Sequence, residues 1–257
     1  ILFEKLKMED LHALFNDEFE IQELGKMLVE NANQFNFDGY VLEIYIQLNG
    51  QSKANINHIV NDITDLLNSN KKILILVIPP PLAVVREEED DKAIFTLDDF
   101  NLLKQKVYAF SLMTYDFATH NGMVAPNAPT QWIEKNVEYY LKDEYDLSIR
   151  SKILLGLNFY GMKFEISANN KNQVINQPEP IIGSRFIEFL KEHSMEIRYE
   201  PEGKEHVFIT EANKKKIIVW YPTLYSIFER IELADQLGTG LSIWELGQGL
   251  NYFYDLL

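Results

Sequence analysis

The sequence predicts an α/β fold built on a parallel sheet, and two observations support this prediction. Short apolar runs alternate with longer amphipathic stretches along most of the chain, which is typical of βα units. One of these runs, residues 73–78, contains only Ile, Leu and Val and is followed by three prolines, which cannot continue a central strand. An apolar share of 46% over 257 residues suits one large domain or two small ones.

The elements are predicted in chain order from two periodicities. Helices are expected where apolar residues recur every three to four positions, and strands where short apolar runs occur. The predicted strands lie at 1–4, 37–45, 73–78, 109–116, 153–161 and 241–245. The predicted helices lie at 18–34, 56–67, 130–141, 223–237 and 250–257. Gly238 is expected to end the fourth of these helices, and Trp132 is expected to pack in the core.

About 60 residues after position 161 break this alternation. A helix is expected at 183–192, and β-like runs are expected at 195–199, 207–210 and 217–220. Two charged runs, 86–91 and 214–216, are predicted to be a solvated loop and a solvated turn.

Composition excludes several classes of function. The formal net charge of −15 argues against nucleic acid as a partner, because like charge repels a phosphate chain. The chain has no run of about 18 apolar residues, so no membrane span is predicted. It contains no Cys, which excludes disulfides and Cys-ligated metals. The chain begins in an apolar run without a starting Met or a signal peptide, so we expect a targeting signal to lie upstream.

The strand predicted at 37–45 carries an acid that needs explanation. Its even positions are apolar, whereas its odd positions include Glu43 and Tyr45, so one face would pack on helices and the other is mixed. A half-exposed antiparallel strand with Glu43 in water satisfies the same alternation.

This segment resembles glycoside hydrolase family 18, whose fourth barrel strand carries Asp-x-x-Asp-x-Asp-x-Glu after a Phe. Asp38 holds the first position of that pattern, Val41 replaces the second Asp, and Glu43 replaces the third. Tyr45 occupies the position of the family's catalytic Glu, which protonates the leaving oxygen while the substrate's acetamido group attacks. A phenol with a pKa near 10 is a poor proton donor near neutral pH, so the resemblance implies a domain without the usual acid.

Further parts of the family pattern follow in the expected order. Met113, Tyr115 and Asp116 match the Met-x-Tyr-Asp of the sixth strand, although an Asp at the end of a buried strand is also an ordinary turn former. Asn158 replaces the Pro of the family's Gly-x-Pro-x-Tyr-Gly, which Tyr160 otherwise matches.

Trp244 stands where the family keeps the Trp under its N-acetyl sugar. A buried structural Trp is the alternative, but an aromatic ring at the rim of a barrel suits the C–H faces of a sugar.

The resemblance implies a (β/α)₈ TIM barrel of the family 18 type, of which the chain covers about strands 3 to 8. It also implies a small α+β insertion between strand 7 and its helix. The expected organisation is barrel at 1–161, insertion at 162–221 and barrel again at 222–257. The first two barrel strands would come from upstream.

The favoured function is a catalytically inactive, chitinase-like lectin for N-acetylglucosamine-containing oligosaccharides. The expected carbohydrate-binding residues are Glu43, Tyr45, Tyr115, Asp116, Asn158, Tyr160 and Trp244. No cofactor and no metal are predicted. An enzyme whose acid has moved to Glu4 or Glu245 is the second hypothesis, and a pseudoenzyme that binds a receptor or a sorting protein is the third. The resemblance implies a secreted or lysosomal location.

Overall fold

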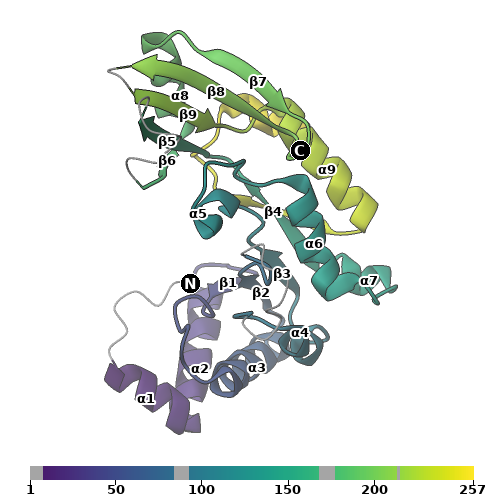
Figure 1. Ribbon diagram of the computed structural model, residues 1–257. Helices are drawn as coiled ribbons and strands as arrows, with labels where there is room; N and C mark the ends of the chain where they lie inside the picture. Colours follow the sequence, from purple (N-terminus) through teal and green to yellow (C-terminus); the bar gives the residue numbers. More distant parts are fainter. Residues whose placement is uncertain (1–7, 84–92, 168–176, 213–214) are drawn as a thin grey trace. The chain divides into compact units, whose positions relative to one another are not determined.

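The computed structural model describes residues 8–83, 93–167, 177–212 and 215–257 (Figure 1). Residue contacts divide the chain into two compact units. Unit 1 comprises Ile1–Pro81, Glu89–Met113 and Tyr139–Leu154, and unit 2 comprises Leu82–Glu88, Thr114–Glu138 and Leu155–Leu257. The predicted strand at 1–4 and the charged run at 86–91 lie outside the described residues.

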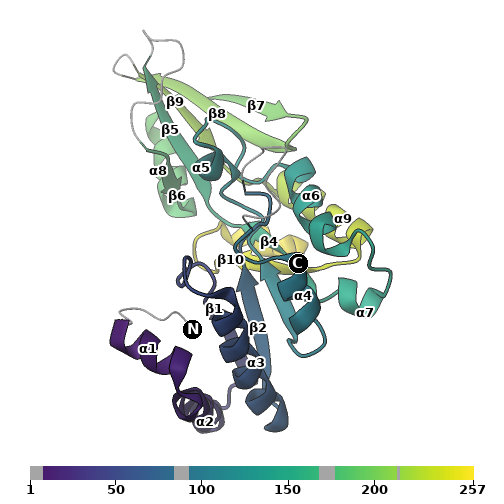
Figure 2. The same cartoon turned by 60° about the horizontal axis from the view of Figure 1, so that its bottom comes forward.

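Unit 1 is built on parallel strands with helices packed against them (Figure 2). Strand β1 pairs with β2, with Gly39 opposite Ile73, and β2 pairs with β3, with Ile75 opposite Ala109. A Cβ at Gly39 would lie 1.9 Å from the carbonyl oxygen of Ile73, so only glycine fits there. The elements are α1 (Met8–Asn16), α2 (Glu18–Gln34), β1 (Gly39–Glu43), α3 (Lys53–Ser69), β2 (Ile73–Ile78), α4 (Leu97–Leu103), β3 (Ala109–Leu112) and α7 (Leu147–Arg150).

The helices of unit 1 begin where side chains cap them. Asp17 accepts a hydrogen bond from the Phe19 N–H at 2.9 Å and so satisfies a donor of the first turn of α2. Thr96 and Asp99 form a reciprocal capping box at the start of α4. Parallel strands require a crossover connection, which α3 provides between β1 and β2.

Aromatic rings fill the core of unit 1. The ring centroids of Phe100 and Phe110 lie 5.0 Å apart, and those of Phe100 and Tyr140 lie 5.3 Å apart. Phe95 joins the cluster at 5.9 Å from Phe110, and the side chains of Phe95, Phe100 and Phe110 are all fully buried. Such aromatic pairs stabilise a core beyond the area they bury.

We therefore predict that replacing Phe110 by Ala lowers the free energy of unfolding by about 3–5 kcal/mol, because it leaves a cavity in this cluster. Tyr108 is the matched control, since it precedes β3 by one residue and is 58% exposed. Replacing Tyr108 by Ala should change the free energy by no more than about 0.5 kcal/mol. Urea denaturation measures both variants, and equal losses would contradict this description of the core.

Unit 2 contains an antiparallel sheet with the strand order β6-β5-β9-β8-β7 (Figure 1). Its strands are β5 (Gly161–Ser167), β6 (Glu179–Ile181), β7 (Glu196–Glu200), β8 (Glu205–Ala212) and β9 (Lys215–Trp220). Helix α8 (Gly183–Glu192) contacts this part of the fold through Phe186, whose ring stacks on Tyr221 at 3.8 Å. This sheet and helix are the α+β insertion that the sequence predicts.

The remaining elements of unit 2 include α5 (Phe117–Asn121), α9 (Leu224–Leu237), β10 (Gly240–Trp244) and the 3₁₀ helix η2 (Asn251–Leu256). Helix α6 (Thr130–Leu141) and strand β4 (Ile153–Asn158) each run from one unit into the other. Gly238 ends α9 in the left-handed conformation at φ 68°, as expected for a residue without Cβ. In the parallel sheet, neighbouring strands follow the order β1-β2-β3-β4-β10.

The predicted fold class is confirmed: the chain is an α/β protein with a parallel sheet of the TIM-barrel type and an antiparallel insertion. Strand β2 and helices α6 and α8 have the predicted bounds, and Trp132 is buried. Within the described residues the parallel sheet has five strands, and none of the helices is long and apolar enough to cross a membrane.

Some local predictions were wrong. The strand expected at 109–116 ends at Leu112, because the chain turns at Asp116 into α5. Lys215 and Lys216 begin β9 instead of forming a turn, since they pair with Ser167 and Ile166 of β5. The helix predicted at the end of the chain is present as the 3₁₀ helix η2.

Candidate functional site

The predicted site residues of unit 1 lie at the carboxyl end of β1. Glu43 is the last residue of the strand, is half-buried, and pairs in register with Val77. Tyr45 follows two residues later and is 1% exposed. Its ring packs edge-on against Phe95 at 4.8 Å between centroids. The position that resembles the family's acid is therefore inside the core of unit 1.

A chain of hydrogen bonds holds the Tyr45 hydroxyl. This hydroxyl donates to Asn57 Oδ1 on α3, and Asn57 Nδ2 donates to Asp99 Oδ1 at 2.5 Å. Asp99 Oδ2 in turn accepts from the backbone N–H and the hydroxyl of Thr96, at 2.8 and 2.7 Å. The phenolic O–H is therefore hydrogen-bonded to a buried amide inside unit 1.

Burial raises the pKa of the Tyr45 phenol well above its usual range, and the neighbouring Asp99 raises it further. Both effects disfavour the phenolate, because a buried anion loses hydration and a nearby carboxylate repels it. A phenol whose pKa is raised in this way is a weak proton donor near neutral pH.

The raised pKa predicts how stability depends on alkaline pH. In the unfolded chain this phenol loses its proton near pH 10, whereas the folded protein keeps it to higher pH. Above about pH 10 the unfolded state therefore binds fewer protons, so this contribution to stability is complete below pH 10 and is lost as pH rises.

Replacing Tyr45 by Phe should make the free energy of unfolding fall less steeply between about pH 9 and about pH 11. The variant should also lose about 1–3 kcal/mol at neutral pH, because Asn57 Oδ1 would be left buried without its donor. Denaturant unfolding across this pH range measures both effects, and identical slopes would contradict the buried position of the phenol.

The second group of predicted site residues lies together in unit 2. Tyr160 donates a hydrogen bond from its hydroxyl to Asp116 Oδ1 at 2.5 Å, and the rings of Tyr115 and Tyr160 lie 6.2 Å apart, edge to face. Tyr115 and Tyr160 are buried, and Asp116 is half-buried. Burial raises the pKa of Tyr160, and the Asp116 carboxylate raises it further, so the phenol donates and the carboxylate accepts.

The backbone at Asp116 has an unusual conformation. Its φ of 65° is left-handed, a region that non-glycine residues seldom adopt, and it leads directly into α5. The Asp116 N–H donates to Asn127 Oδ1 at 3.1 Å, and the Phe117 N–H donates to the Asn127 carbonyl oxygen at 3.0 Å. Asn127 is fully buried, so it fixes the turn that presents the carboxylate of Asp116.

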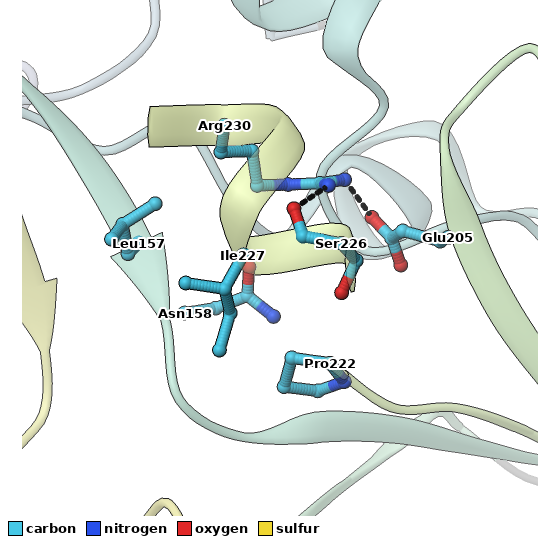
Figure 3. A pocket seen from close by; sticks show the side chains of 7 residues that line it. All are labelled: Leu157, Asn158, Glu205, Pro222, Ser226, Ile227 and Arg230. Carbon is cyan, nitrogen blue, oxygen red and sulfur yellow. Dashed lines mark hydrogen bonds and ion pairs between the residues drawn. The ribbon is translucent and has the colours of Figure 1, made fainter. Parts of the chain in front are cut away.

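Asn158 lies at the end of β4 beside a small cavity of unit 2 (Figure 3). Its amide donates to the backbone carbonyl of Tyr160 at 2.8 Å. The cavity measures about 10 Å³ and is lined by Leu157, Asn158, Glu205, Pro222, Ser226, Ile227 and Arg230. That volume suits about one water molecule and is far too small for a sugar ring.

Trp244 ends β10 and is 38% exposed, so its ring is available at a strand end. Its carbonyl oxygen accepts a hydrogen bond from the Phe159 N–H at 2.7 Å, which ties β10 to the end of β4. The peptide bond between Trp244 and Glu245 is cis. Glu245 is exposed and accepts a hydrogen bond from Gln248 Nε2 at 2.8 Å.

Unit 2 therefore brings Tyr115, Asp116 and Tyr160 together and connects Asn158 to them through the backbone of Tyr160. Glu43 and Tyr45 lie in unit 1. The role of all seven residues as carbohydrate contacts stays a prediction. No group of three or more His, Cys, Asp or Glu side chains suited to a metal ion occurs among the residues that the structure describes.

Sequence reasoning missed three residues around this group, namely Asn127, Glu205 and Arg230. Arg230 lies on the buried face of α9, three residues after Ile227, where helical periodicity calls for an apolar residue. A cation at such a position indicates a buried partner, and that signal was available in the sequence.

Comparison with known proteins identifies the family. The chain matches the family described as glycosyl hydrolases family 18 over residues 9–249. Because this match spans most of the chain, the protein belongs to glycosyl hydrolases family 18.

Solved structures share the fold at low sequence identity. The spore cortex-lytic enzyme SleL of Bacillus megaterium is 17% identical with a TM-score of 0.76, and the alignment covers 100% of this chain and 56% of SleL. A chitinase from Chromobacterium violaceum is 17% identical with a TM-score of 0.74, covering 93% of this chain and 71% of that one. A family 18 N-acetylglucosaminidase from Paenibacillus barengoltzii is 14% identical with a TM-score of 0.73, covering 96% and 77%. The chain thus spans little more than half the length of SleL.

Proposed function

We propose that this domain binds N-acetylglucosamine-containing oligosaccharides, such as chitin oligomers, without hydrolysing them. The observation that carries the proposal is the state of Tyr45, the residue at the position that resembles the family's acid. Its phenol is buried, donates a hydrogen bond to Asn57 Oδ1, and has a raised pKa. A glycosidase needs an acid to protonate the leaving oxygen, and such help contributes about 10²–10⁴-fold to the rate.

Unit 2 contains side chains whose chemistry suits a sugar, and these support the proposal. Trp244 offers an exposed aromatic ring, on which the C–H face of a pyranose can stack. Asp116 is a half-buried carboxylate that already accepts one hydrogen bond, from Tyr160, and its remaining lone pairs can accept from sugar hydroxyl or amide groups. These are the stacking and polar groups of a saccharide site.

A narrower resemblance supports the same proposal. The segments 110–116, 152–162 and 242–250 resemble chitinase domain-containing protein 1, the stabilin-interacting chitinase-like protein. That likeness implies a protein of the secretory or lysosomal pathway that binds saccharides without the usual acid. A receptor or a sorting protein is the further partner that it implies.

The contribution of Trp244 can be measured directly. Replacing Trp244 by Ala should weaken the binding of chitin oligomers by about 1–3 kcal/mol, because an aromatic stacking surface is lost. The matched control is Tyr145→Ala, since Tyr145 is an 83% exposed aromatic residue of unit 1. Titration calorimetry with oligomers of increasing length gives the affinities, and unchanged affinity in a folded Trp244 variant would show that this ring only packs.

Catalysis provides the second test. We expect no turnover of chitin oligomers or aryl chitobiosides above background, with binding retained. Replacing Tyr45 by Glu should give at most slight activity, because Val41 also lacks the family's acid and Glu43 is one methylene longer than its Asp.

The alternative enzyme has its acid elsewhere, and Glu245 is the described candidate because it is exposed beside Trp244. Robust hydrolysis by the unmodified chain, abolished by Glu245→Gln or Glu4→Gln, would overturn the lectin proposal. Absence of both hydrolysis and saccharide binding would instead favour a pseudoenzyme that acts through protein partners.

A further inference from the structure

Two buried charges connect the insertion to helix α9. Glu205 at the start of β8 and Arg230 on α9 form an ion pair with an N–O distance of 2.8 Å, and each residue is 3% exposed (Figure 3). Removing water from two charges is unfavourable, so a buried ion pair of this kind needs further hydrogen bonds to compensate for the lost hydration.

Those further hydrogen bonds converge on the segment that precedes α6. The two carboxylate oxygens of Glu205 accept from the backbone N–H groups of Asn127, at 3.0 Å, and Ala128, at 2.6 Å. The Arg230 guanidinium donates to the Ala128 carbonyl oxygen and to the Ser226 carbonyl oxygen, the latter at 2.7 Å. The ion pair therefore forms hydrogen bonds with the N–H groups of residues 127 and 128 and with the carbonyl oxygen of residue 128.

Asn127 connects the ion pair to Asp116 through two hydrogen bonds. Its side-chain oxygen accepts from the Asp116 N–H, and its carbonyl oxygen accepts from the Phe117 N–H. These two bonds offset part of the cost of the left-handed backbone at Asp116, a conformation that is unfavourable for a non-glycine residue. Asp116 in turn accepts the hydroxyl of Tyr160.

We propose that Glu205 and Arg230 are positioning residues for saccharide binding, which act through Asn127 to fix the Asp116 carboxylate and its Tyr160 partner. The inference rests on the proposed function, in which Asp116 contacts the saccharide. In this inference the insertion, through Glu205 of β8, sets the position of the Asp116 carboxylate. An ion pair that only attached the insertion to α9 would not need to accept a hydrogen bond from the backbone of Asn127.

The variants are chosen to separate positioning from general destabilisation. Glu205→Gln keeps the shape and one acceptor but loses the charge and one of the two backbone hydrogen bonds. Val207→Ala is the matched control, because it lies two residues further along β8, is 7% exposed, and takes no part in the chain of hydrogen bonds. Asn127→Ala removes the acceptor of the Asp116 N–H and the side-chain interaction with Tyr160, while it keeps the backbone bonds of residue 127. It is the second variant if Glu205→Gln does not fold.

The first readout needs no ligand. Hydrogen exchange at the Asp116 amide, followed by NMR on the full chain, should be faster by about tenfold in Glu205→Gln and in Asn127→Ala, because the bond to Asn127 Oδ1 is weakened or lost. Val207→Ala should change exchange at this amide no more than at the other buried amides of unit 2. Equal exchange at Asp116 in all three variants would overturn the positioning role.

The second readout is a double-mutant cycle with a chitin tetramer as the probe. Asn127→Ala should weaken binding by about tenfold in the unmodified chain and by much less in an Asp116→Asn background, because its effect passes through that carboxylate. Additive losses would overturn the inference. The unmodified chain could bind no chitin oligomer while hydrogen exchange at Asp116 still becomes faster in Glu205→Gln. That result would contradict the proposed function but would support the structural connection between Glu205 and Asp116.

Discussion

The buried ion pair between Glu205 and Arg230 is the interaction on which the architecture of unit 2 depends. It joins the first residue of β8, the buried face of α9 and the backbone of residues 127–128. Removing one partner would leave an uncompensated buried charge, at a cost of about 3–5 kcal/mol. The same pair holds the turn at Asp116, so the insertion and the candidate site share one structural support.

Unit 1 also depends on long-range contacts, because the residue at the position that resembles the family's acid is part of its core. The Tyr45 ring fills space against Phe95, and its hydroxyl completes a buried series of hydrogen bonds through Asn57 and Asp99. A carboxylate at this position would be desolvated and would lie close to Asp99, which repels it. Replacing Tyr45 by an acid would therefore disturb this packing and place two carboxylates close together.

The fold was largely predictable because its elements follow simple periodicities. The apolar run of β2 and the helical spacing of α6 and α8 set their bounds correctly, and the wholly apolar strand indicated a parallel sheet. The candidate site was predictable only as a set of residues. The hydrogen-bond partner of Tyr45 is Asn57, which is 12 residues away in the sequence, and Asn57 is in turn bonded to Asp99. Glu205 accepts a hydrogen bond from Asn127, which is 78 residues away in the sequence. Local patterns carry no information about contacts at such separations, so the burial of Tyr45 and the support of Asp116 emerged only from the structure.

The most direct measurement is a crystal structure of the full chain soaked with a chitin tetramer. We expect an intact oligomer, with one N-acetylglucosamine ring stacked on Trp244 and a hydrogen bond between the sugar and the carboxylate of Asp116. We also expect the Tyr45 hydroxyl to stay hydrogen-bonded to Asn57. A cleaved oligomer, or a sugar bound away from Trp244 and Asp116, would contradict the proposed binding function.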